Sequence, residues 1–158
     1  GGMLIRLLAA GTRMPGWVNA GVEDYARRIG GQLKFELKEI PLGTRSSPGD
    51  TARAMADEGR RMLAAIKPDT FVTTLEVTGK PLTTEQLATW LGQRLQSGQD
   101  LALLIGGPDG LAPECLRRSQ HRWSLSPLTL PHSLVRIVVA EQLYRAQTIL
   151  SGHPYHRP

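Results

Sequence analysis

The pattern of apolar and polar residues predicts strands that alternate with helices along the whole chain. The largely apolar stretch 3–11 predicts a buried first strand, and the continuous apolar run 101–105 is typical of a strand covered on both faces. Residues 34–40 alternate apolar and polar side chains, which indicates a half-exposed strand. Two further strands are predicted at 70–77, before a turn at the sequence TGKP, and at 122–126.

Apolar residues that recur three or four positions apart predict helices between and after these strands. The first helix is marked by Val18, Val22 and Ile29. The third helix opens with a capping-box pair, Thr83 and Gln86, which satisfies two backbone amides at a helix start. The remaining helices are predicted up to about residue 66, over 113–120 and over 133–150.

This alternation predicts an α/β fold in which a mainly parallel sheet carries helices on both faces. The chain has 158 residues, which suits one domain with a substantial core. Residues 1–2 are expected to be a tag remnant, so we expect a single domain over 3–158. Residues 41–50 are rich in Pro, Gly and Ser and are expected to form a mobile loop.

Composition argues against several classes of protein. No apolar run approaches the roughly 18 residues that a membrane span needs, and no signal peptide is visible, so a cytoplasmic location is expected. Cys115 is the single cysteine, which excludes an internal disulfide framework and offers no metal cluster. We expect Cys115 to be a packed residue on a helix and expect no metal site.

The distribution of charge suggests a nucleic-acid partner. The formal net charge is +5, and the whole excess lies in residues 115–158, where every cation is an arginine. Arginine suits bidentate phosphate contacts and stacking on bases. The alternative is a solvated face that only keeps the protein soluble.

Ligands of such sheets bind beyond the carboxyl ends of the strands. Three stretches fall there, namely the end of TTLE, the loop GGPDG at 106–110 and the loop LSPLTLP at 125–131. GGPDG lacks the lysine of a Walker A loop, and the N-terminal turn lacks the dinucleotide fingerprint. Pro108 removes an amide donor and Asp109 adds negative charge, which disfavours a polyphosphate. An adenosine without phosphates fits the two loops better.

Three motifs resemble one family. LLIGGPDGL, SLSPLTLPHSLVRIVVAEQLYRA and the terminal HPYHR are similar to the RlmH (YbeA) family of SPOUT-class methyltransferases, and the similarity extends from Met3 to the C-terminus. The resemblance implies a C-terminal deep trefoil knot, S-adenosyl-L-methionine as cofactor and a homodimer. It also implies methylation of N3 of a pseudouridine in the intersubunit-bridge hairpin of 23S rRNA, and we expect assembled ribosomes as the substrate. No membrane or DNA partner is expected.

The resemblance also implies site residues. The cofactor contacts fall on Leu75, Gly106, Leu125, Ser126, Pro127, Leu128, Thr129 and Leu130. Glu76 could contact the ribose or the methionine part, or it could be a solvated charge at a strand end. The catalytic candidates are His132, Tyr155, His156 and Arg157. The family's tail lies near the partner's active site, whereas the residues alone would predict a frayed terminus.

The chemistry leaves the general base open. N3 of pseudouridine must lose a proton to attack, so a base or a cation that stabilises the anion is useful. His132 could serve, or it could merely cap the final helix, and positioning of the cofactor with arginine electrostatics could suffice. The final helix is apolar nearly all round, which predicts a dimer interface or a central core helix.

Three rival functions remain. The first is a SPOUT enzyme that modifies another RNA, such as tRNA. The second is a non-enzymatic RNA-binding module whose footprint is the basic C-terminal region. The third, a nucleotide-binding oxidoreductase, is weakened by the missing fingerprint.

Overall fold

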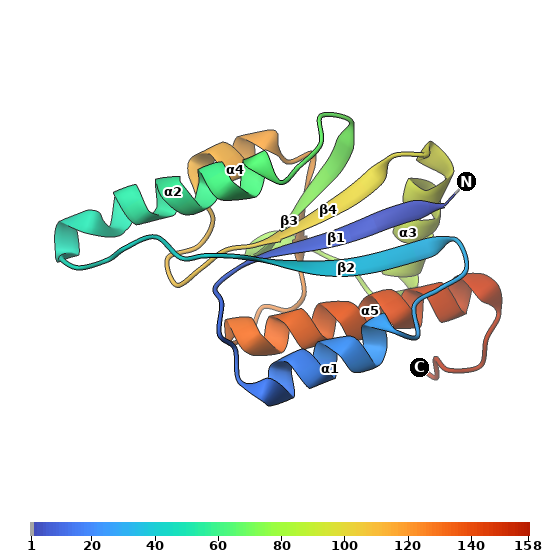
Figure 1. Cartoon of the computed structure of the whole chain (residues 1–158). Helices are drawn as coiled ribbons and strands as arrows, with labels where there is room; N and C mark the ends of the chain where they lie inside the picture. The colour runs from blue at the N-terminus through green and yellow to red at the C-terminus, as the bar shows by residue number, and fades with distance from the viewer. Residues whose placement is uncertain (1) are drawn as a thin grey trace.

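The five predicted strands form one parallel sheet in the computed structural model, which describes residues 2–158 (Figure 1). The sheet order is β2-β1-β4-β3-β5, and every pair in it is parallel. The predicted parallel α/β sheet is therefore confirmed. The strands are β1 (Met3–Ala10), β2 (Leu33–Ile40), β3 (Thr70–Pro81), β4 (Asp100–Ile105) and β5 (His121–Ser124).

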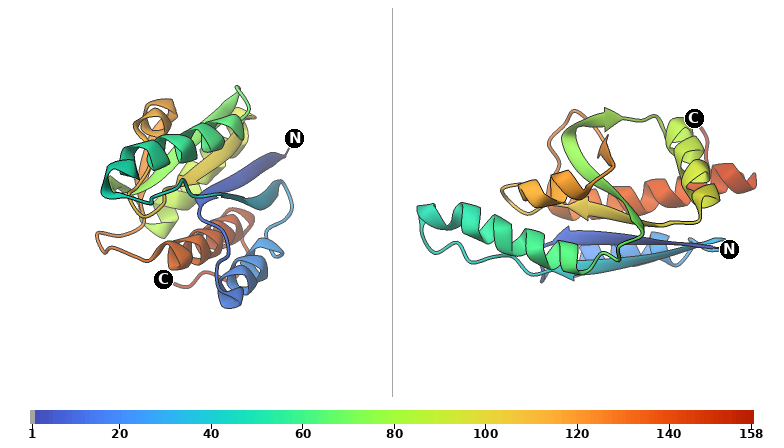
Figure 2. Two further views of the ribbon diagram at one scale, coloured as in Figure 1. Left: turned by 60° about the vertical axis from the view of Figure 1, so that its left-hand side comes forward. Right: turned by 90° about the horizontal axis from the view of Figure 1, so that it is seen from above.

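Helices cover both faces of the sheet, as predicted (Figures 1 and 2). One face carries α1 (Gly16–Ala26), α3 (Thr84–Ser97) and α5 (His132–Ser151), and the other carries α2 (Thr51–Ala64) and α4 (Pro113–Arg118). The predicted capping box opens α3, because the Thr83 side chain accepts from Gln86 N at 3.1 Å. None of the helices within residues 2–158 is both long and apolar enough to cross a bilayer.

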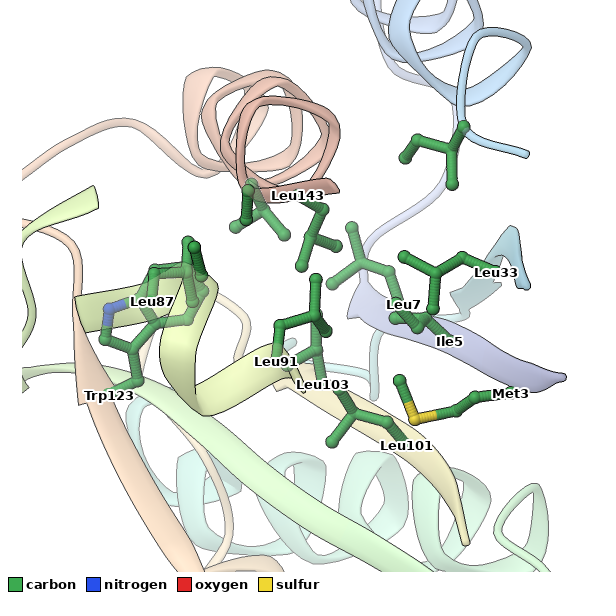
Figure 3. Close-up of a cluster of buried hydrophobic side chains, with 14 of the residues drawn as sticks. Met3, Ile5, Leu7, Leu33, Leu87, Leu91, Leu101, Leu103, Trp123 and Leu143 are labelled. Carbon is green, nitrogen blue, oxygen red and sulfur yellow. The ribbon is translucent and has the colours of Figure 1, made fainter. Parts of the chain in front are cut away.

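Each face of the sheet has its own apolar core. In β4, Leu101 and Leu103 point to the core under α3 and α5, whereas Ala102 and Leu104 point to the core under α2 and α4. Figure 3 shows the first core, in which Leu143 of α5 packs with leucines of α3 and the strands. Burial on both faces explains the apolar runs of β4 and of the second half of β1, since each buried leucine contributes about 2 kcal/mol.

The second core contains Cys115, which is fully buried on α4 as predicted. Burial raises the pKa of its thiol to about 11, so the thiol stays protonated and unreactive. No group of three or more His, Cys, Asp or Glu side chains within residues 2–158 is placed to bind a metal.

The predicted turn at TGKP is wrong, because β3 continues through Pro81. Leu75 and Lys80 both pair with Trp123 of β5, so the strand bulges between them. A Cβ on Gly79 would lie 2.7 Å from the carbonyl carbon of Trp123, which explains the glycine at this close approach. The bulge takes Glu76, Val77 and Thr78 out of the ladder and turns them toward the site described below.

The stretch predicted as a loose loop is anchored to its surroundings. Ser47 and Asp50 form a capping box on a short 3-10 helix, η1 (Pro48–Asp50), that leads into α2. Gly43 donates its amide to the buried carboxylate of Glu58 at 2.9 Å. The tag remnant expected at residues 1–2 concerns Gly1, which lies outside the described residues.

Candidate active site

A cavity of about 390 Å³ opens at the carboxyl ends of β3 and β4, where a parallel sheet is expected to bind ligands. The segments around it are the β3 bulge, the glycine loop 106–110, the loop 125–131 between β5 and α5, and the start of α5. Its lining residues are Leu75, Glu76, Val77, Thr78, Ile105, Gly106, Gly107, Pro108, Gly110, Leu111, Leu125, Ser126, Leu128, Thr129, Leu130, His132 and Val135. The two loops singled out in the sequence therefore face one cavity.

The glycine loop forms one wall of this cavity. It folds back on itself, since the Gly110 amide donates to Gly107 O at 3.0 Å and Gly110 has a φ of 87°. A Cβ on Gly106 would lie 2.6 Å from the amide nitrogen of Leu111. Gly106 is thus required for the close approach of two backbone segments, and it is one of the residues that line the cavity.

The loop 125–131 forms the facing wall. Ser126 shapes it, because its hydroxyl accepts from the Leu128 amide at 3.0 Å and its carbonyl accepts from the Ser124 hydroxyl at 3.1 Å. Leu128 lines the cavity and is 69% exposed. Of the residues predicted to hold the cofactor, Pro127 alone is not among those lining the cavity.

Two ionisable side chains line the cavity, Glu76 and His132. Glu76 Oε2 is buried and accepts no hydrogen bond from residues 2–158, while Arg122 Nε lies 3.8 Å away across the bulge. His132 is exposed at the first turn of α5. No Lys or Arg appears among the described residues that line the cavity, so its electrostatics suit an uncharged or cationic ligand better than a polyphosphate.

Asp109 does not contribute its charge to the cavity, contrary to the sequence argument. Its carboxylate turns away and accepts from Arg45 Nε at 2.8 Å, and Asp109 is absent from the lining. The absence of basic side chains, rather than the presence of this aspartate, is what makes the cavity unsuited to phosphates.

The other three catalytic candidates lie at the far end of α5 within the chain. Tyr155 donates its hydroxyl to Glu141 Oε2 at 2.9 Å, and His156 contacts Glu85 Oε1 at 3.0 Å and Arg145 Nη1 at 3.1 Å. Glu141 is nine residues beyond His132 along the helix, which separates them by about 14 Å of helix axis. The single chain therefore brings His132 to the cavity but not the tail.

Contacts with the charged side chains of Glu141 and Arg145 on α5 hold the C-terminal tail, residues 153–157, in place. Burial alone would raise the pKa of Glu141, but hydrogen bonds from Arg145 and Tyr155 outweigh it and hold that pKa below its usual value. Burial and the bond to Glu141 raise the pKa of Tyr155. The tail is thus a folded element and not the frayed terminus that its residues alone would predict.

The basic C-terminal region is less available to a partner than its composition indicates. Arg136 is fully buried and donates to Glu39 Oε2 at 2.6 Å and to Gly11 O at 2.8 Å. Arg145 is held by Glu141, and Arg118 donates to the carbonyl of Thr70 at 3.0 Å. Half of the six arginines therefore serve the fold, and the exposed ones are Arg117, Arg122 and Arg157.

Sequence reasoning missed part of the site. Val77 and Thr78 line the cavity because β3 bulges, and the predicted turn concealed this. Gly107, Pro108 and Gly110 line it beside the predicted Gly106, and their place in the same loop was the available signal.

The chain matches the family model described as "Predicted SPOUT methyltransferase" over residues 3–156. It is 57% identical over 155 residues to the ribosomal RNA large subunit methyltransferase H of Alkalilimnicola ehrlichii, covering 98% of this chain and 99% of that protein. It is 54% identical over 155 residues to the protein of the same name from Pseudomonas putida, with 98% and 100% covered.

Solved structures share the fold at low sequence identity. A "Probable Methyltransferase" from Bordetella pertussis superposes with a TM-score of 0.57 at 17% identity, covering 90% of this chain and 95% of that one. A protein from Legionella pneumophila, solved with the cofactor SAM bound, gives a TM-score of 0.50 at 13% identity over 92% of this chain and 66% of that one. Family model and close relatives together establish that the chain belongs to the SPOUT methyltransferases and, within them, to the ribosomal RNA large subunit methyltransferase H family.

Proposed function

We propose that the chain is an S-adenosyl-L-methionine-dependent methyltransferase of large-subunit ribosomal RNA, and that its target is N3 of a pseudouridine in the intersubunit-bridge hairpin of 23S rRNA. The observation that carries the proposal is the convergence of Leu75, Gly106 and the loop 125–131 on one cavity. The names of the close relatives support the RNA class. The pseudouridine target rests on the family resemblance alone.

The cavity fits the proposed methyl donor. S-adenosylmethionine carries a flat adenine, no phosphate, a cationic sulfonium, and an amino-acid end with one ammonium and one carboxylate group. The aliphatic side chains of Leu75, Ile105 and Leu130 suit the adenine, and the exposed glycine-loop backbone can approach it closely. The buried Oε2 of Glu76 lies 3.8 Å from Arg122 Nε but accepts no hydrogen bond from residues 2–158, so it would be an acceptor for a hydroxyl or a cationic group.

When bound, S-adenosylmethionine would supply an electrophilic methyl group, because its positively charged sulfur is a good leaving group. In the transfer, the carbon–sulfur bond would break with its electron pair going to sulfur, a carbon–nitrogen bond would form at N3, and the N3 proton would pass to a base. The cavity walls would align the donor and exclude water. This alignment would contribute most of the acceleration of methyl transfer. His132, on the rim, would accept the N3 proton.

The working unit would be a homodimer. Trp17 of α1 is 56% exposed and Leu134 of α5 is 39% exposed, so the α1–α5 side presents apolar surface that a second copy would cover. In such a dimer the tail of one copy would reach the cavity of the other. Tyr155 and His156 would then orient the base to be methylated, and Arg157, which is exposed, would grip a phosphate.

Assembled ribosomes in the cytoplasm would be the substrate. The chain is small and only three arginines of its basic C-terminal region are exposed, so recognition would depend on a preformed ribosomal surface more than on that region's charge. Transfer should nevertheless fall with added salt, because each phosphate contact releases counterions.

The proposal is tested by calorimetry with S-adenosylmethionine, followed by transfer of a labelled methyl group to intact ribosomes, naked 23S rRNA and tRNA. We expect stoichiometric binding and labelling of ribosomes in preference to either free RNA. Labelling of tRNA alone would favour the rival SPOUT activity. Absence of S-adenosylmethionine binding would leave a non-enzymatic RNA-binding module, and NAD binding in its place would indicate the oxidoreductase.

A further inference from the structure

We infer that Arg45 is a positioning residue for the methyl-donor site, acting through Asp109 to hold the glycine loop 106–110 in its binding shape. Arg45 lies outside the cavity, in the loop between β2 and η1, 64 positions before Asp109 in the chain. The inference rests on the proposed function, since it concerns how the same cavity binds its donor.

Arg45 joins two carboxylates from different parts of the fold. Its Nε donates to Asp109 Oδ2 at 2.8 Å, and its Nη1 donates to Glu58 Oε2 at 2.7 Å. The planar guanidinium makes both contacts from a fork, which an ammonium group could not reproduce. The Arg45 and Glu58 side chains are 20% and 4% exposed, so water screens their contact less than an open surface pair, whereas the Asp109 side chain is 38% exposed.

Glu58 of α2 holds Arg45 through an ion pair. It lies on α2 with only 3% of its surface exposed, and its Oε2 also accepts the Gly43 amide at 2.9 Å. Its Oε1 would lie 3.3 Å from a Cβ on Gly107, so the carboxylate is packed directly against the glycine loop. A buried carboxylate needs a charged partner, and Arg45 provides it.

The contact between Arg45 and Asp109 holds the glycine loop that forms one wall of the cavity. Asp109 lies at the tip of the loop, between Pro108 and Gly110, both of which line the cavity while Asp109 itself does not. Within the loop, the Gly110–Gly107 bridge is the backbone link across the turn. Without Arg45, two carboxylates would face each other across this short loop, and like charges would favour its opening.

The geometry predicts a defect in donor binding with little change in turnover. Asp109→Ala leaves Arg45 paired with Glu58, so the variant should fold. Its Kd and KM for S-adenosylmethionine should rise about threefold to tenfold, as expected for the loss of one partly exposed ion pair. The kcat at saturating donor should stay within about twofold, because bound donor restores the loop.

The experiment compares Asp109→Ala, Arg45→Ala and the double variant by calorimetry with S-adenosylmethionine, by methyl-transfer kinetics and by thermal unfolding. The matched control is Asp57→Ala, which removes a carboxylate from another arginine pair, Arg60–Asp57 on α2. The double variant should bind no more than about twofold worse than Arg45→Ala, because the two residues act through one contact. Arg45→Lys should recover only part of the affinity.

Hydrogen exchange of the peptide spanning 106–111 gives a readout independent of the ligand. We expect faster exchange in Asp109→Ala than in the wild type or Asp57→Ala, because the hydrogen bond from the Gly110 amide to Gly107 O opens more often when the loop is not held closed. Unchanged exchange with unchanged Kd in Asp109→Ala would overturn the inference, as would fully additive effects of the two substitutions. If the wild type itself fails to bind S-adenosylmethionine, the proposed function falls instead.

Discussion

Replacing Gly106 with alanine should disable the proposed donor site with little effect elsewhere in the fold. The added Cβ would lie 2.6 Å from Leu111 N and 2.8 Å from Gly110 O, distances that no relaxed carbon adopts. Both neighbours are backbone, so no side chain can rotate out of the way. The loop 106–110 must therefore shift, and with it one wall of the cavity.

The magnitude follows from the cost of overpacking, which is about 1–3 kcal/mol for one extra carbon in a tightly packed place. In the free variant the loop relieves this strain by moving. Binding the donor requires the original wall, so the strain returns in the complex and weakens binding by up to the same amount. The Kd for S-adenosylmethionine should rise between about 5-fold and 150-fold.

Calorimetry with S-adenosylmethionine, alongside thermal unfolding, measures both parts of this prediction. Gly49→Ala is the matched control, because a Cβ there meets no atom within 4 Å. Gly110→Ala separates backbone strain from packing, since Gly110 has a φ of 87° and open space around it. The reasoning is refuted if Gly106→Ala folds and binds S-adenosylmethionine with the affinity of the wild type.

Three further predictions concern residues away from that wall. Burial, together with the charges of Lys80 and Arg94, lowers the pKa of His121. The unfolded chain therefore binds more protons at that site, and stability should fall as the pH drops through about 6.5 and toward the lower folded pKa. Urea unfolding at several pH values should show this slope in the wild type and a smaller one in His121→Gln; equal slopes would contradict it. Tyr155→Phe removes the bond to Glu141 and should cost about 1 kcal/mol in unfolding free energy. It should also slow methyl transfer while S-adenosylmethionine binding stays unchanged, and unaltered transfer would count against the tail's proposed role. Arg136→Ala leaves the Gly11 carbonyl and the partly exposed carboxylate of Glu39 without their buried partner, so denaturation should show a loss of about 1–3 kcal/mol. A loss below about 1 kcal/mol would mean that water replaces the arginine.

Local patterns were enough to predict most of the fold. The apolar runs of β1 and β4 and the capping box of α3 depend on neighbours in sequence or on burial on both faces, and the structure confirms them. The TGKP turn failed because pairing with β5 outweighs the local preference of Gly79 and Pro81 for a turn. Membership of the SPOUT class implies the trefoil knot. No sequence periodicity predicts it, because the general rules for chain connections argue against knots.

The site was predictable where it depends on loops and not where it depends on long-range pairing. Gly106 and the loop 125–131 stand at strand ends, so the sheet topology alone brings them together. The pairing of Arg45 with Asp109 joins residues with no shared pattern, and nothing local distinguishes Arg45 from a solvated cation. Composition likewise could not separate Arg136, buried in an ion pair, from Arg157, which faces solvent.

The most direct test of the account is nucleoside mass spectrometry of large-subunit rRNA after incubation with this protein and labelled S-adenosylmethionine. The substrate should be ribosomes from cells that lack the modification. The account predicts one labelled methyl group, on N3 of a pseudouridine in the intersubunit-bridge hairpin, and a large loss of label with Gly106→Ala but not with Gly49→Ala. A labelled nucleoside of another kind, or no labelled rRNA from a protein that binds S-adenosylmethionine, would contradict it.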